Sequence, residues 1–90
     1  SILAMDVYLA KLRRELKQAL TKKLSRTLPH WKGVGGVTKS KVIYALPASR
    51  NIYESPEEYE RIVYGTAEEI LREQGFIYHP LEFFWQYQRR

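Results

Sequence analysis

The sequence predicts a small α+β domain: a long basic N-terminal helix, a glycine-rich loop, a short strand, an acidic helix and an aromatic C-terminal strand in a small sheet. Three observations predict this class. Two stretches carry apolar residues at helical spacing, and a third alternates apolar with polar residues as strands do. The 90 residues leave room for a single domain, which divides into a basic helix at 1–32, a loop at 33–41 and a strand–helix–strand unit at 42–90.

The first helix is predicted from leucines that recur every three or four residues between Leu9 and Leu28. Asp6 stands where an N-cap is expected, and Pro29 is expected to end the helix. The opposite side carries long polar side chains, namely Lys11, Arg14, Gln18, Lys22 and Arg26. One face should therefore pack on the core, while the other meets solvent or a partner.

The segment Gly33–Ser40 reads GVGGVTKS and is expected to be a mobile loop, because it is rich in glycine and has no apolar period. It departs from the phosphate-binding pattern G-x-x-x-x-G-K-[ST] at Thr38, where that pattern requires glycine. No strand precedes the segment and no strand ending in aspartate follows it, so ATP or GTP binding is not expected. The four residues Gly33–Gly36 also resemble the GxxG loop with which KH domains clamp a nucleic-acid backbone.

The middle of the chain predicts a strand followed by a helix. Val42–Leu46 is short, apolar and partly β-branched, which favours a buried strand, although a helix remains an alternative. The next helix has Ser55 as N-cap, Pro56 at its first position and Gly75 at its end. A capping-box pattern that begins after Gly65 could bend or break this helix.

The C-terminal strand is predicted from apolar residues at every second position. Its apolar positions, expected to face the core, are Leu81, Phe83, Trp85 and Tyr87. The preceding Phe76–Pro80 is either a lead-in or a separate short strand that bends at Pro80. Phe84 lies on the opposite face, so the strand is apolar on both sides and we expect Phe84 at a homodimer interface.

Charge is distributed unevenly along the chain, whose net charge is +5. Residues 1–32 hold eight Lys or Arg and two acidic residues, whereas residues 54–75 hold seven Glu and two Arg. Two interpretations stay open. The first helix either presents a basic face to a polyanion or lies beside the acidic helix within the fold.

The expected function is non-catalytic nucleic-acid binding through the first helix and the loop. The candidate side chains are Lys11, Arg14, Lys22, Arg26, Trp31, Lys32, Lys39 and Lys41. Trp31 is expected to be an exposed ring on which a base could stack. The backbone amides of Gly33, Gly35 and Gly36 are candidate phosphate contacts, with a solvated hinge as the alternative. The partner is DNA or RNA, and the sequence does not distinguish them.

Two other functions stay open: a protein-interaction or assembly subunit that forms homo-oligomers, and a small toxin-like nuclease. His30 and His79 are the only imidazoles, and no carboxylate is placed beside either, so no catalytic residue is assigned. The chain has no cysteine and no metal-binding motif, and we expect neither a metal nor a cofactor. No apolar run approaches the about 18 residues that a membrane span needs, so we expect no membrane contact and a cytoplasmic location.

Overall fold

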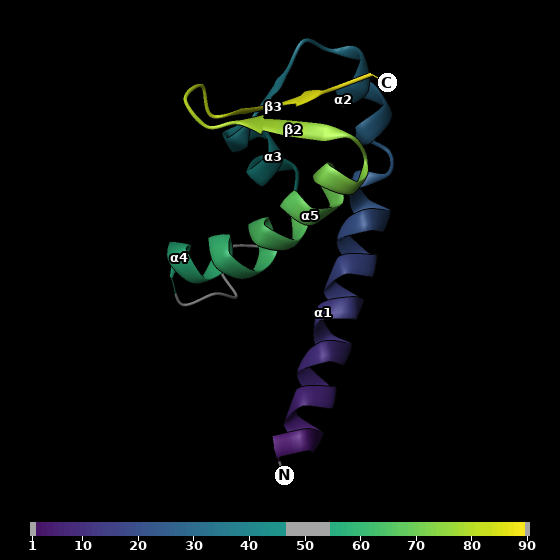
Figure 1. The fold of residues 1–90 in the computed structure, drawn as a ribbon, viewed down its shortest axis with the longest axis vertical. Helices are drawn as coiled ribbons and strands as arrows, with labels where there is room; N and C mark the ends of the chain where they lie inside the picture. The colour runs from purple at the N-terminus through teal and green to yellow at the C-terminus, as the bar shows by residue number, and fades with distance from the viewer. Residues whose placement is uncertain (1, 47–54, 90) are drawn as a thin grey trace.

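The computed structural model describes residues 2–46 and 55–89. Its elements are α1 (Ile2–Leu24), α2 (Leu28–Gly33), β1 (Val37–Thr38), α3 (Lys39–Ala45), α4 (Pro56–Tyr59), the π-helical turn η2 (Glu60–Tyr64), α5 (Gly65–Glu73), β2 (Phe76–His79) and β3 (Phe84–Tyr87). The expected α+β class, with a long N-terminal helix and a small sheet, is confirmed. The sheet and α5 gather around the C-terminal end of α1, and the rest of α1 extends away from them (Figure 1).

The sheet is antiparallel with the order β1–β3–β2. Strand β3 is central, and its Trp85 pairs with Val37 on one side and Tyr78 on the other. The expected aromatic strand is therefore confirmed, and Phe76–His79 is a separate strand. The predicted core face was wrong at Leu81 and Phe83, because His79 pairs with Phe84 and the residues between them form the hairpin turn.

The first helix begins and ends earlier than predicted. Because α1 starts at Ile2, Asp6 lies within the helix, and the expectation that it is the N-cap was wrong. α1 stops at Leu24, and Thr27 N donates to Leu24 O at 2.8 Å in the turn that follows. Pro29 does not end a helix but stands in the first turn of α2, where its missing N–H costs no hydrogen bond. This second helix buries Leu28 and Trp31.

The predicted strand at Val42–Leu46 is a helix, α3, so that expectation was wrong. Its cause is local: the Thr38 hydroxyl accepts a hydrogen bond from Lys41 N at 3.1 Å and caps the helix. Val42 is fully buried on one side and Tyr44 is 91% exposed on the other. The glycine-rich loop, predicted over 33–41, thus shrinks to residues 34–36.

The acidic helix begins as predicted and continues past Gly65. Ser55 Oγ accepts from Glu58 N at 3.1 Å, and Gly75 takes a φ of +94° just beyond the helix end. Gly65 keeps helical angles, and the Thr66 hydroxyl donates to Ile62 O at 2.7 Å. The capping box therefore does not form, and η2 and α5 run on without a break.

The core lies between the sheet and the helices. Its largest buried side chains are Trp31, Trp85, Leu20, Leu24, Ile70 and Leu71. Tyr59 and Trp85 are buried as predicted. The Trp85 indole donates to the Tyr64 hydroxyl at 2.9 Å, which satisfies the indole N–H inside the core.

Candidate nucleic-acid interface

α1 is supported by the fold only near its C-terminal end. Leu20 and Leu24 are buried, whereas every residue from 4 to 15 is exposed. At a rise of about 1.5 Å per residue the helix is about 35 Å long, and the two shorter dimensions of the molecule are 28 and 24 Å. The helix is therefore too long for the small core to cover.

Basic side chains occupy one side of this projecting helix. The helical repeat places Lys11, Arg14 and Lys22 on a common side, and Arg26 follows in the turn after Leu24. All four are exposed. We call these four residues the basic face.

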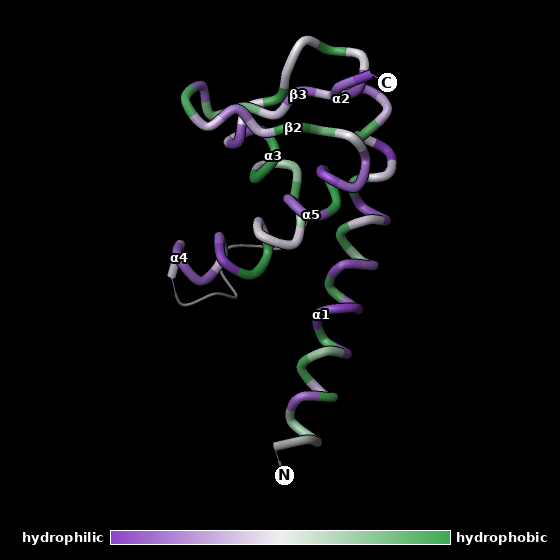
Figure 2. The backbone as a smooth tube through the Cα atoms, in the orientation of Figure 1, coloured by the Kyte–Doolittle hydropathy of each residue, from purple (hydrophilic) through white to green (hydrophobic). Residues whose placement is uncertain are grey.

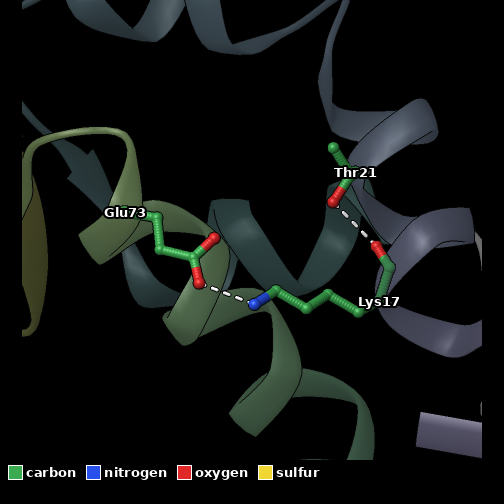
Figure 3. A network of polar contacts seen from close by, with 3 residues as sticks. All are labelled: Lys17, Thr21 and Glu73. Carbon is green, nitrogen blue, oxygen red and sulfur yellow. Dashed lines mark hydrogen bonds and ion pairs between the residues drawn. The ribbon is translucent and has the colours of Figure 1, made fainter. Parts of the chain in front are cut away.

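The acidic helix neutralises little of this charge. Lys17 of α1 donates to the Glu73 carboxylate of α5 at 2.6 Å (Figure 3), and this hydrogen bond raises the pKa of Lys17 above its usual value. Within residues 2–46 and 55–89, the other ion pairs are Lys39–Glu60 and Arg72–Glu68. No residue of the basic face belongs to an ion pair in that part of the chain. Pairing of the first helix with the acidic helix therefore accounts for the charge of Lys17 only.

Two of the predicted lysines near the loop interact with the fold itself. The Lys32 ammonium lies 5.1 Å from the ring centre of Tyr87 and donates to Gln74 at 3.4 Å. The Lys39 ammonium lies 5.0 Å from the Tyr64 ring centre, with Glu60 at 3.9 Å. Lys41 is exposed. The fold therefore engages the ammonium groups of Lys32 and Lys39, which makes them less available to a partner than the basic face.

Trp31 is not an exposed stacking platform. Only 2% of its surface is accessible, so the prediction of an exposed ring was wrong. The physical reason is α2, whose helical turn directs Trp31 and Leu28 into the core beside β3. A buried ring offers no face to a base.

The three candidate glycines have different surroundings. A Cβ at Gly33 or Gly35 would have no atom within 4 Å, whereas a Cβ at Gly36 would lie 2.5 Å from the Phe84 ring. Phe84 also stacks on His79, with ring centres 4.9 Å apart. Phe84 is half-buried. Its ring lies against the backbone of Gly36, which leaves no room for a Cβ at that position. Gly33 and Gly35 are the open positions.

The described residues show neither a metal-binding cluster nor a membrane-spanning helix. Residues 2–46 and 55–89 contain no group of three or more His, Asp or Glu that could hold a metal ion. His30 is exposed on α2, and His79 lies in β2 against Phe84. None of the helices in this part of the chain has the length and apolar character needed to cross a bilayer.

Sequence reasoning missed one feature of α1. It assigned Leu9 and Leu12 to the core, but they are 45% and 43% exposed, and Met5 is 57% exposed. Apolar segments continue along α1 well beyond the part that meets α5 (Figure 2). Helix length compared with the size of a 90-residue core was the signal that could have revealed it.

Comparison with known proteins gives no further assignment. No protein-family model, no curated protein and no solved structure matches the chain. The functional argument therefore depends on the charge and exposure of the described side chains.

Proposed function

We propose that this protein binds nucleic acid without catalysis, through phosphate contacts made by the basic face of α1. The observation that supports this most is the exposure of Lys11, Arg14, Lys22 and Arg26 with no ion pair in the described part of the chain. Cations that a fold leaves exposed and does not neutralise are available to a polyanion.

The spacing of the basic face suits a phosphate backbone. Lys11 and Lys22 are separated by about 16 Å along the helix axis, and duplex DNA presents about ten phosphate charges over that length. Each cation that meets a phosphate displaces counterions, which supplies a favourable entropy of binding. The same chemistry serves RNA.

We propose that this binding does not depend on the base sequence of the nucleic acid. The described α1 cations are lysine and arginine on a solvent-exposed helix side, and Trp31, the one aromatic assigned to base stacking, is buried. Phosphate contacts position a protein on nucleic acid but carry no base information. Lys41 and the backbone at Gly33 and Gly35 are exposed and would add secondary phosphate contacts.

The test is a comparison of two charge-reversal variants that change net charge equally. Lys11→Glu with Arg14→Glu removes half of the basic face, and Arg61→Glu with Arg89→Glu changes two exposed arginines elsewhere. At low salt we expect the first variant to lose retention on a DNA or RNA column, and the second to keep most of it. Equal loss in both variants would show that only net charge matters and would reject the basic face.

The rival role as an assembly subunit has its own observation, the exposed apolar residues of α1. Of these, Met5, Leu9 and Leu12 lie on a different side of the helix from the basic face. The two roles are therefore compatible, and each needs a separate test.

A further inference from the structure

Four apolar residues of α1 form a continuous stripe. Met5, Leu9, Leu12 and Leu16 follow one another at intervals of four, three and four residues. This is the spacing of the core positions of a coiled coil, which keeps the stripe facing a neighbouring helix. We call these four residues the apolar seam.

The fold leaves most of the seam uncovered. Met5, Leu9 and Leu12 are each more than two fifths exposed, and only Leu16 reaches the core. Single exposed leucines are ordinary, but a contiguous apolar stripe on a projecting helix marks an interaction surface. Helices in water also depend on tertiary packing of their apolar side for most of their stability.

We propose that a second copy of this chain covers the seam, with the two α1 helices antiparallel. In the alignment that buries the seam best, Leu9 lies against Leu12 of the partner subunit. Met5 then lies against Leu16 of the partner subunit, and symmetry repeats both layers. The seam is thus complementary to itself.

Charges beside the seam select the same alignment. Asp6 and Arg13 flank the seam on one side and are exposed. The alignment places Asp6 beside Arg13 of the partner subunit, and symmetry makes this ion pair twice. On the other flank, Glu15 comes beside Tyr8 of the partner subunit, where the phenol can donate to the carboxylate. Opposite charges at these flanking positions set orientation in paired helices.

A parallel pair lacks these contacts. In register, it places Arg13 beside Tyr8 of the partner subunit and leaves Asp6 without an opposite charge. The seam repeat continues through Ala19 to Lys23, and a parallel pair brings Lys23 against Lys23 of the partner subunit. The antiparallel pair ends before Lys23 and avoids this repulsion.

Sedimentation equilibrium on the whole 90-residue chain tests the proposal. We expect a dimer at micromolar concentration for the wild type and a monomer for Leu12→Lys. The matched control is Val7→Lys, because Val7 is 70% exposed but lies away from the seam. A monomeric wild type overturns the proposal, as does a Leu12→Lys variant that remains a dimer.

Charge exchange tests the orientation without touching the seam. Asp6→Arg should weaken dimerisation by about tenfold, because it sets like charges face to face at two symmetric positions. Adding Arg13→Asp restores opposite charges and should return the wild-type dissociation constant. Failure of the double variant to recover would contradict the antiparallel alignment.

Cysteine pairs give an independent measure of orientation, since the chain has no native cysteine. Leu9→Cys and Leu12→Cys are oxidised separately and as an equal mixture. The antiparallel pair predicts efficient cross-linking in the mixture and little in either variant alone. Efficient cross-linking of a single variant by itself would indicate a parallel pair and overturn the proposal.

Discussion

At the residue scale, neighbouring positions of the glycine-rich segment have different physical roles. Gly36 allows the Phe84 ring to lie against the backbone, while Gly35 borders open space. Thr38, which replaces the last glycine of the phosphate-loop pattern, caps α3 through its hydroxyl. The resemblance to a phosphate loop is therefore accounted for by packing and capping.

Substitution at two of these glycines separates their roles. Gly36→Ala should lower the free energy of unfolding by about 1–3 kcal/mol, because the added Cβ displaces a packed ring. Gly35→Ala, the matched control, should change it by less than about 0.5 kcal/mol. Urea titration measures both. Equal effects would contradict the close approach of Phe84 to Gly36.

The Tyr64 hydroxyl is the hydrogen-bond partner of the buried Trp85 indole. Tyr64→Phe leaves that N–H without an acceptor in the core and should cost about 1–3 kcal/mol of stability. Tyr44→Phe is the control, because Tyr44 is 91% exposed. A Tyr64→Phe variant as stable as the Tyr44→Phe variant would show that the indole bond contributes nothing.

The raised pKa of Tyr64 predicts that the stability of the fold depends on pH. Burial raises the pKa of Tyr64 to about 12. In the unfolded chain the pKa of a tyrosine is about 10. The neutral phenol therefore stabilises the fold fully below pH about 10, and this contribution is lost as pH rises from about 10 through about 12. The stability gap between wild type and Tyr64→Phe should narrow over that window. A constant gap would contradict the shift.

At the scale of elements, the sequence predicted what local patterns determine. The Ser55 cap, the leucine repeat of α1 and the alternation around Trp85 all depend on residues close in the chain. Long-range packing decided the rest. Trp31 is buried because α2 lies against β3, a contact between segments more than fifty residues apart. Phe83 is exposed because strand pairing fixes the position of the hairpin turn.

The segment Val42–Leu46 shows how a local signal can be ambiguous. A short apolar run fits a strand or a helix equally well, and the Thr38 cap decides for helix α3. Thr38→Ala should cost about 1 kcal/mol of stability, whereas Ser40→Ala, two residues further on and exposed, should cost little. Thermal unfolding of both variants measures the difference. A Thr38→Ala variant with wild-type stability would mean that the cap does not hold α3.

At the scale of the whole molecule, α1 carries both proposed surfaces. Its basic face is exposed and has no ion pair in the described part of the chain, and its apolar seam lies on another side. The sequence predicted the charge of this helix but placed Leu9 and Leu12 in the core. How far α1 extends beyond the core becomes clear only when the length of the helix is compared with the dimensions of the molecule.

The most direct test of the central claim is the salt dependence of nucleic-acid affinity. Four phosphate contacts by the basic face predict that the logarithm of the duplex-DNA association constant falls with the logarithm of salt concentration at a slope of about −4. Lys11→Glu with Arg14→Glu should reduce that slope to about −2 or abolish binding. Undetectable binding by the wild type at low salt, or a slope near zero, would contradict the claim that α1 binds phosphates.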